Sequence, residues 1–273
     1  NGEIVAMTGD GVNDAPSLKA ADIGVAMGTG VDVAKQAADM ILADDNFATI
    51  EKAIEEGRGV YENIRKSVIF LLSSNLGELM TMFVAVAMGL ASPLKSSHIL
   101  WINLITDSLP ALALGVDKND SKSLMRCPPR KASESLFARG GIACTLFYGA
   151  LITGIGLAAF LMLPCGILAA EGELVGNPFT WVERLRKLMS REQILAKSQT
   201  YAFTVLGMCQ LYHAVGMRDM QKSVFAMRPW DNLLMVAACI IGFVLQFAVT
   251  EIPFLIRAFG TSHLSGQEWL LLS

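Results

Sequence analysis

The chain has 273 residues, of which 53% are hydrophobic and 17% are charged, and its formal net charge is −3 at pH 7. An ordinary soluble domain carries about 25% charged residues, so this composition indicates that part of the chain lies in lipid. Residues 1–66 carry charged side chains throughout, whereas apolar blocks alternate with short polar loops from Ser67 onward. The sequence has no basic stripe of the kind that indicates nucleic-acid binding. The five cysteines show no C-x-x-C spacing, so neither a zinc site nor a redox pair is implied.

Residues 1–58 predict half of a doubly wound α/β domain. Short apolar runs of the kind that forms buried parallel strands lie at residues 4–8, 23–27 and 40–42. Segments of helix-forming composition separate these runs, at residues 15–21 and 31–38. Alternation of strand and helix at this spacing is typical of a parallel sheet covered by helices.

A long helix is expected to begin near Phe47 and to continue without proline to about residue 91. From Tyr61 to Leu90 such a helix would be about 45 Å long. The hydrocarbon core of a bilayer is roughly 30 Å thick, so the first turns should project into water. We therefore expect this helix to act as a rod between the soluble part and the bilayer.

Residues 59–273 predict an α-helical transmembrane bundle, and hence a multi-pass integral membrane protein. Further spans are expected at residues 99–116, 142–163, 201–217 and 233–250, with the beginning of another at 269–272. The loops 117–141 and 218–229 are basic, which places them on the cytoplasmic side with residues 1–60. The short loops and the lack of a visible retention signal favour the plasma membrane. The chain has no initiator Met, and we interpret it as a fragment of a longer protein.

The first strand leads into Asp10, Asn13 and Asp14, within the segment T-G-D-G-V-N-D-A-P. Open α/β sheets bind ligands at this place, where a strand ends and a helix begins. Gly9 and Gly11 allow the backbone to approach a phosphate closely. Carboxylates beside a phosphate form a hard oxygen site that suits Mg²⁺. The alternative is a turn rich in Asp and Asn that only caps a helix.

Two acidic residues, Glu78 and Asp107, lie inside expected spans, where a central Asp costs about 2.5–3.5 kcal/mol. Asn75 shares a helix face with Glu78, and Asn103 and Thr106 share one with Asp107. All these groups present oxygen, which argues against copper and zinc. Calcium takes 6–8 oxygen ligands, so the set suits Ca²⁺, although sodium and manganese stay open. Interhelical hydrogen bonding is the structural alternative.

Gly77 and Pro110 stand next to these acidic clusters. Both residue types permit local unwinding, which frees main-chain carbonyls to face a cavity. We expect both helices to be irregular at these points.

The segment T-G-D-G-V-N-D-A-P, with A-A-D-I-G-V-A at 20–26 and M-I-L-A-D-D-N-F at 40–47, resembles the hinge region of P-type ATPases, which are haloacid-dehalogenase-like. The resemblance implies that Asp10 binds the magnesium that bridges to an aspartyl phosphate. It also implies that Asn13 contacts the phosphate and that Asp14 supports the loop. The phosphorylated Asp and the ATP-binding domain would lie upstream, so the fragment alone is expected to be inactive.

The segments S-S-N-L-G-E at 73–78 and L-W-I-N-L-I-T-D-S-L-P-A at 100–111 resemble the fifth and sixth membrane helices of calcium pumps of the sarco/endoplasmic reticulum type. The resemblance implies calcium transport driven by ATP, with Mg²⁺ as cofactor. Those pumps have a further Glu ligand on the eighth helix, where this chain has Gly207, with Gln210 one turn away. We therefore expect one calcium per cycle.

Protonation of Glu78 or Asp107 in the ion-free state would ease their burial, which predicts proton countertransport. Two alternatives stay open at this point. One is a P-type pump for sodium, potassium or manganese, and the other is a membrane-tethered phosphatase of the haloacid dehalogenase type.

Overall fold

The computed structural model describes residues 4–119, 121–128, 130, 134–171, 178–219 and 227–273. The chain separates into two compact units, residues 1–62 with 118–138 and residues 63–117 with 139–273. Helix α3 (Ala48–Ala87) is continuous and contributes residues to both units.

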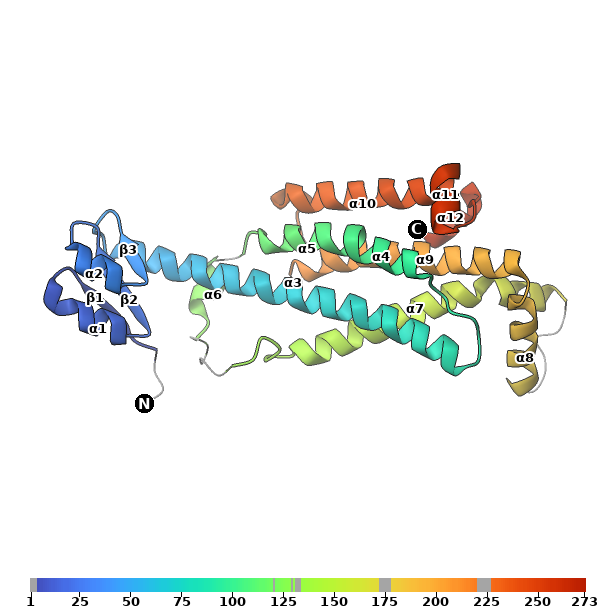
Figure 1. Cartoon of the computed structure of the whole chain (residues 1–273), viewed down its shortest axis with the longest axis horizontal. Helices are drawn as coiled ribbons and strands as arrows, with labels where there is room; N and C mark the ends of the chain where they lie inside the picture. Colours follow the sequence, from blue (N-terminus) through green and yellow to red (C-terminus); the bar gives the residue numbers. More distant parts are fainter. Residues whose placement is uncertain (1–3, 120, 129, 131–133, 172–177, 220–226) are drawn as a thin grey trace. The chain divides into compact units, whose positions relative to one another are not determined.

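A three-stranded parallel sheet organises the first unit, in the order β1-β2-β3 (Figure 1). Its strands are β1 (Ala6–Gly9), β2 (Ile23–Met27) and β3 (Met40–Leu42). The short helix η1 (Val12–Asp14) and helix α1 (Ala15–Ala20) join β1 to β2, and α2 (Asp32–Ala37) joins β2 to β3. Helix α1 packs against β1, β2 and α2. This arrangement confirms the predicted α/β organisation.

Burial in this sheet is greatest on the central strand, although Leu42 of β3 is also buried. Val25 and Ala26 of β2 are fully buried, whereas Val5 is 54% exposed and Ile41 is 51% exposed. The expectation that the first strand is buried is therefore wrong for the described residues. The physical reason is that α1 and α2 cover the central strand and leave apolar side chains of the outer strands open.

The segment after residue 117 belongs to the first unit and holds the start of α3. It includes the short helix α6 (Ser121–Arg126). The guanidinium of Arg58 donates to the carbonyl oxygens of Leu124 and Cys127, at 2.8 and 3.0 Å. Arg130 forms a 3.1 Å ion pair with Glu62 and lies over the ring of Tyr61.

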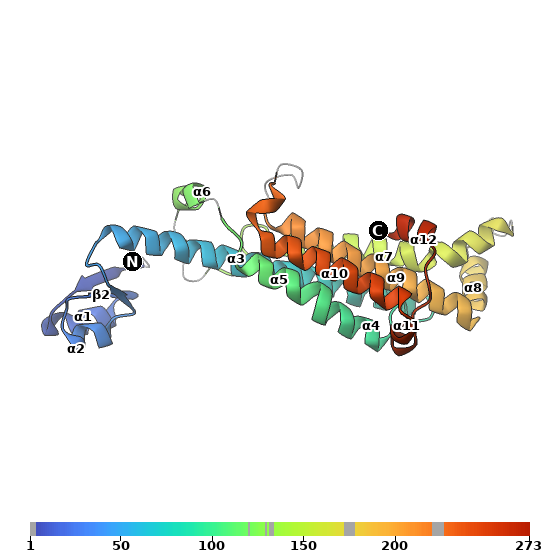
Figure 2. The same ribbon diagram turned by 90° about the horizontal axis from the view of Figure 1, so that it is seen from above.

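The second unit is a bundle of helices around α9 (Glu192–Met217), whose buried residues extend from Ser198 to Met217. Around it lie α4 (Ser96–Trp101), α5 (Ser108–Gly115), α7 (Gly141–Ala170) and α10 (Leu233–Glu251). Shorter helices are α8 (Pro178–Met189), η4 (Pro229–Asp231), α11 (Pro253–Phe259) and α12 (Gly266–Leu272). Helix α9 packs against α7, α5 and α10, and α5 and α10 lie side by side (Figures 1 and 2).

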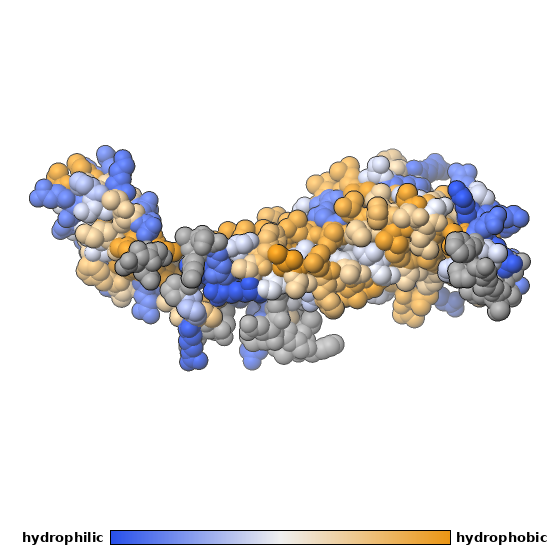
Figure 3. Space-filling model, turned by 90° about the horizontal axis from the view of Figure 1, so that it is seen from below, coloured by the Kyte–Doolittle hydropathy of each residue, from blue (hydrophilic) through white to orange (hydrophobic). Residues whose placement is uncertain are grey.

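Three of the described helices, α3, α7 and α10, are long and apolar enough to cross a membrane. Figure 3 shows apolar residues, in orange, over much of the visible face of the second unit. Among the large apolar side chains that are exposed, Leu79 is 65% and Phe83 is 63% accessible. The segments 99–116 and 201–217, which were also expected to span the membrane, are helical but are not among these three candidate membrane-spanning helices. The first is divided among successive elements, and α9 carries polar residues because protein surrounds it.

The two expected irregularities have different outcomes. Around Pro110 the helix departs from α geometry, since residues Ile102–Asp107 form the π-helical element η2 between α4 and α5. At Gly77, by contrast, α3 stays α-helical, so unwinding there is wrong. Gly77 instead permits a close approach, because a Cβ there would lie 2.5 Å from the side chain of Ile152 on α7.

A buried ion pair holds one end of this bundle together. Asp117 accepts hydrogen bonds from Nε and one terminal nitrogen of Arg218, at 3.0 and 3.2 Å. Nδ2 of Asn232, just before α10, donates to the same carboxylate at 2.9 Å, and Nδ2 of Asn63 on α3 donates to the Asp117 carbonyl at 2.8 Å. The cluster thus joins α3, α9 and α10 to the end of α5.

Candidate phosphate and cation sites

The loop after β1 is held by the carboxylate of Asp14. Its Oδ2 accepts hydrogen bonds from the main-chain N–H groups of Asp10, at 3.1 Å, and Gly11, at 3.0 Å. Asp14 itself is half-buried, whereas the side chains of Asp10 and Asn13 are exposed. The loop therefore presents one carboxylate and one amide to solvent while a second carboxylate organises its backbone.

The other loops at this edge of the sheet are tied to it by hydrogen bonds. The N–H of Val31 donates to the Asp10 carbonyl at 2.9 Å. The Thr29 hydroxyl donates to Asp45 at 2.5 Å and lowers the pKa of that carboxyl below its ordinary value. The Thr49 hydroxyl lowers the pKa of Asp44 in the same way. Both aspartates are therefore acceptors fixed within the loops.

In the bundle, Glu78 of α3 is linked to Thr106 of η2 through a side chain of α9. Nε2 of Gln210 donates to Oε1 of Glu78 at 2.5 Å. Oε1 of Gln210 lies 2.9 Å from Oγ1 of Thr106, which also lies 2.9 Å from the carbonyl oxygen of Ile102. Glu78, Thr106 and Gln210 are all buried. Helices α3, η2 and α9 thus contribute side-chain oxygen atoms to one buried cluster.

Asp107 is 1% exposed, and both of its carboxylate oxygens lack a hydrogen-bond partner among the described residues. Its charge interacts with that of Glu78. Buried charges in proteins are normally paired or coordinated to a metal ion, so this carboxylate requires a proton or a cation. Asp107 is the last residue of the π-helical element. The hydroxyl of Ser108, which follows it, donates to the carbonyl oxygen of Asn103 at 2.8 Å. Such turns occur frequently at functional sites.

The two asparagines do not join this group. Asn75 is exposed, and its Nδ2 donates to the carbonyl of Leu71 at 2.7 Å. Asn103 is partly buried, and its Nδ2 donates to the carbonyl of Ile99 at 3.0 Å. The structure therefore brings together Glu78, Thr106 and Asp107 from the predicted set.

Two buried polar side chains of the bundle were not predicted to belong to a site. Gln246 of α10 is fully buried, and neither of its amide atoms has a hydrogen-bond partner among the described residues. Nε2 of His213 lies 2.7 Å from the Ser73 hydroxyl. For Gln246 the available signal was a polar side chain in a largely apolar helix, which in a membrane is a sign of function.

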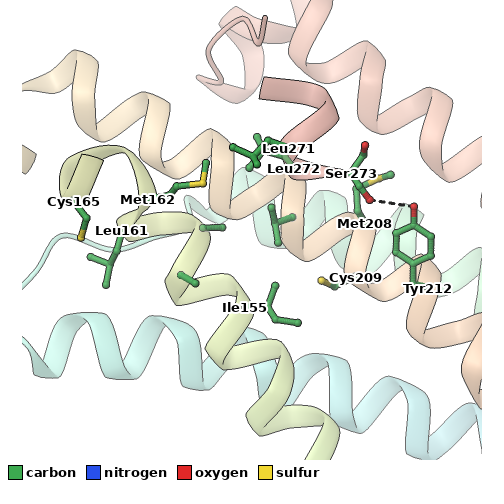
Figure 4. Close-up of a pocket in the computed structure, with 13 residues that line it drawn as sticks. Ile155, Leu161, Met162, Cys165, Met208, Cys209, Tyr212, Leu271, Leu272 and Ser273 are labelled. Carbon is green, nitrogen blue, oxygen red and sulfur yellow. Dashed lines mark hydrogen bonds between the residues drawn. The ribbon is translucent and has the colours of Figure 1, made fainter. Parts of the chain in front are cut away.

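A groove elsewhere in the second unit is of a different kind. It has a volume of about 610 Å³ and is lined from α7, α9 and the C-terminal residues, as Figure 4 shows. Ile155, Met162, Met208 and Leu272 are among its apolar residues, and its lining includes no Asp or Glu. At its edge the Tyr212 hydroxyl donates to the Ser273 carbonyl at 3.1 Å. A groove of this composition does not suit a cation.

Comparison with known proteins covers both units. Residues 91–273 match the family model described as cation transporting ATPase, C-terminus. Residues 1–54 match the haloacid dehalogenase-like hydrolase model. These two matches account for the parallel sheet and for the helical bundle that follows it.

Several curated relatives are similar to the chain along its full length. It is 48% identical over 276 residues to calcium-transporting ATPase 1 of Bacillus cereus, covering 100% of the chain and 30% of that relative. It is 42% identical over 273 residues to the calcium-transporting ATPase of Bacillus subtilis, with 100% and 28% covered. It is 40% identical over 280 residues to the endoplasmic reticulum calcium ATPase srcA of Aspergillus fumigatus, with 98% and 28% covered. The chain thus spans about 30% of these relatives' length, and it belongs to the family of cation-transporting ATPases.

Proposed function

We propose that this chain is part of a pump that uses ATP to move calcium across a membrane through an aspartyl-phosphate intermediate. The observation that carries the proposal is the buried group formed by Glu78, Gln210 and Thr106, together with the unpaired carboxylate of Asp107. The relatives that resemble the whole chain are named calcium-transporting ATPases.

The charge and ligand chemistry of the group support calcium as the cargo. Two carboxylates and one divalent cation sum to zero charge, which suits a site of low dielectric. Carboxylate, hydroxyl and amide oxygens are the ligands that calcium takes in its flexible coordination sphere. Asn75 and Asn103 belong to the proposed set through the resemblance, although in this structure their amides bond to their own helices.

In the soluble unit we assign Asp10 to magnesium, since its carboxylate is exposed at the carboxyl edge of the sheet. When bound, the ion would neutralise charge on a phosphoryl group. Asn13 would donate to a phosphate oxygen from the same loop. Asp14 would keep both in place through its two hydrogen bonds to the backbone.

In the proposed transport cycle, Glu78 and Asp107 take up protons when the cation leaves, and these protons are carried in the opposite direction to the cation. Gly207 offers no side-chain oxygen, which supports one calcium per cycle. We place the pump in the plasma membrane, with residues 1–60 in the cytoplasm, and we expect this chain alone to be inactive because ATP would bind to other domains.

The proposal is tested in the complete protein with Glu78→Gln and Asp107→Asn. Both variants are expected to lose phosphorylation by ATP that depends on calcium, because each removes half of the charge that balances the ion. Glu192→Gln, at the exposed start of α9, is the matched control and should behave as the wild type. Calcium-dependent phosphorylation that is normal in both site variants would contradict the assignment of the site.

Ion identity is tested by comparing calcium, manganese, sodium and potassium as activators of ATP hydrolysis. Stimulation by calcium at the lowest concentration is expected. Stimulation by another of these ions alone would replace calcium as the cargo. Phosphatase activity that no cation stimulates would favour the membrane-tethered phosphatase.

A further inference from the structure

We propose that Gln246 of α10 is a ligand of the cation site, supplying from a neighbouring helix the side-chain oxygen that position 207 of α9 lacks. The juxtaposition that carries the proposal is the Gln246 amide lying against the backbone of Gly207. The inference deepens the proposed function and rests on it.

The space beside Gly207 is filled by the amide of Gln246. A Cβ built at Gly207 would lie 3.1 Å from Oε1, 3.3 Å from Cδ and 3.7 Å from Nε2 of Gln246. The oxygen is thus the amide atom nearest to position 207. A larger residue at position 207 would displace Gln246, so the two positions compete for one place in the bundle.

Gln246 lacks the hydrogen bonds that a structural glutamine makes. It is fully buried, and both Oε1 and Nε2 lack a hydrogen-bond partner among the described residues. A buried polar group without a partner is destabilising, because it has given up its hydrogen bonds to water. The glutamines of α9 differ, since Gln210 bonds to Glu78 and Gln199 donates to the Ser92 carbonyl at 2.8 Å. Gln246 therefore has two buried polar atoms that are available to bind a ligand.

Gln246 contacts the side of α9 that also carries Gln210, which bonds to Glu78. Gly207 precedes Gln210 by three residues, which places both on one side of the helix. Thr204 lies three residues further back, and its buried hydroxyl likewise lacks a partner among the described residues. Helix α10 also packs against α5, which begins directly after Asp107 (Figures 1 and 2). The amide of Gln246 thus lies against the side of α9 that also carries Gln210, the partner of Glu78.

A neutral ligand at this place has a defined consequence. Gln246 adds an oxygen without adding a negative charge, so two carboxylates still balance one divalent ion. A Glu on α9 would instead bring a third negative charge. The site is therefore built for a single divalent cation.

The experiment measures equilibrium binding of radioactive calcium to the complete protein in membranes. Gln246→Leu removes the amide at similar volume and is expected to weaken calcium binding by about 10-fold or more. Gln199→Leu removes another buried glutamine from the bundle and should bind calcium as the wild type does. The double variant Gly207→Glu with Gln246→Gly moves the oxygen ligand to α9 and should bind more tightly than Gln246→Leu.

A folded Gln246→Leu variant that binds calcium with wild-type affinity would overturn the proposal. Where Gln246→Leu does not fold, Gln246→Glu serves in its place because its shape is nearly the same. Its extra carboxylate is expected to tighten calcium binding several-fold, and unchanged affinity in that variant would also overturn the proposal. Failure of the proposed function has a different signature, since Asp107→Asn would then bind calcium normally.

Discussion

Nε2 of Gln210 on α9 donates a 2.5 Å hydrogen bond to Oε1 of Glu78 on α3, inside the bundle. The two residues are 132 positions apart in the chain. Replacing Gln210 with Leu leaves Glu78 without its donor and Thr106 without one of its acceptors. We expect the calcium concentration that half-activates ATP hydrolysis to rise by about 10-fold or more. Gln210→Glu places a second carboxylate beside Glu78. The repulsion between the two should lower the thermal stability of the protein at low calcium. Half-activation at the wild-type concentration in Gln210→Leu would contradict a role for this bridge.

Pro110 follows the π-helical turn and lacks the N–H that a regular helix would use there. Pro110→Ala restores that donor, and we expect residues 102–107 to shift toward α-helical geometry. Asp107 would then rotate away from Glu78, and the affinity for calcium should fall while the thermal stability stays the same or rises. Calcium titration and thermal unfolding of the same preparation separate these two effects. Ala111→Gly, in the same helix, serves as a control for altered helix propensity.

The buried pair of Asp117 and Arg218 is expected to be costly to break. Side-chain exposures are 2% and 8%, so Asp117→Ala leaves a buried charge without its counterion. We expect a loss of about 3–5 kcal/mol in the free energy of unfolding. The double replacement Asp117→Leu with Arg218→Met should cost less than the sum of the single ones. Thermal unfolding measures both.

A more exposed pair provides the comparison. Lys197 lies 2.6 Å from Glu268, with side-chain exposures of 35% and 20%. Lys197→Met should cost no more than about 1 kcal/mol. Equal losses for the two pairs would contradict the importance of burial.

Asp14 holds the loop after β1, so Asp14→Ala should remove the acceptor of two main-chain N–H groups. We expect a loss of about 0.5–1.5 kcal/mol in stability and a larger loss of phosphorylation, because Asp10 and Asn13 would no longer be positioned. Asp14→Asn keeps an acceptor oxygen and should retain more phosphorylation than Asp14→Ala. Equal activities in the two variants would rule out positioning through these hydrogen bonds.

The contact between Thr29 and Asp45 predicts a dependence on pH. The hydroxyl lowers the pKa of Asp45 in the folded state, so its stabilising effect is present above the unfolded pKa and is lost as the pH falls through the folded one. Thr29→Val should therefore increase hydrogen exchange in the loop after β3 at pH 7, and the difference from the wild type should shrink as the pH falls through the folded pKa of Asp45. A difference that does not change with pH would assign the effect to packing.

The alternation of strands and helices in residues 4–42 was sufficient to predict the sheet, because each element is short and its pattern is local. The exposure of Val5 and Ile41 was not predictable, since it depends on which faces the helices cover. Similarly, i, i+3 and i, i+4 spacing predicted a cluster on each membrane helix. It did not indicate that Asn75 bonds to its own helix while Glu78 turns inward.

Contacts between distant helices were the least accessible from sequence. Gln246 lies in a largely apolar helix, and only the packing of α10 against α9 gives it a place beside Gly207. Gly77 was interpreted through its effect on helix geometry, although its missing side chain serves the contact with α7.

That contact has a mechanical consequence. Ile152 occupies the notch left by Gly77, and Leu76 fits in the same way against Gly149 on the facing helix. A sliding motion between α3 and α7 would have to lift both side chains out of these notches, so intermediate positions are disfavoured and the pair settles in discrete steps. Because Glu78 follows Gly77 directly, its carboxylate would move between the same discrete positions as the helix that carries it.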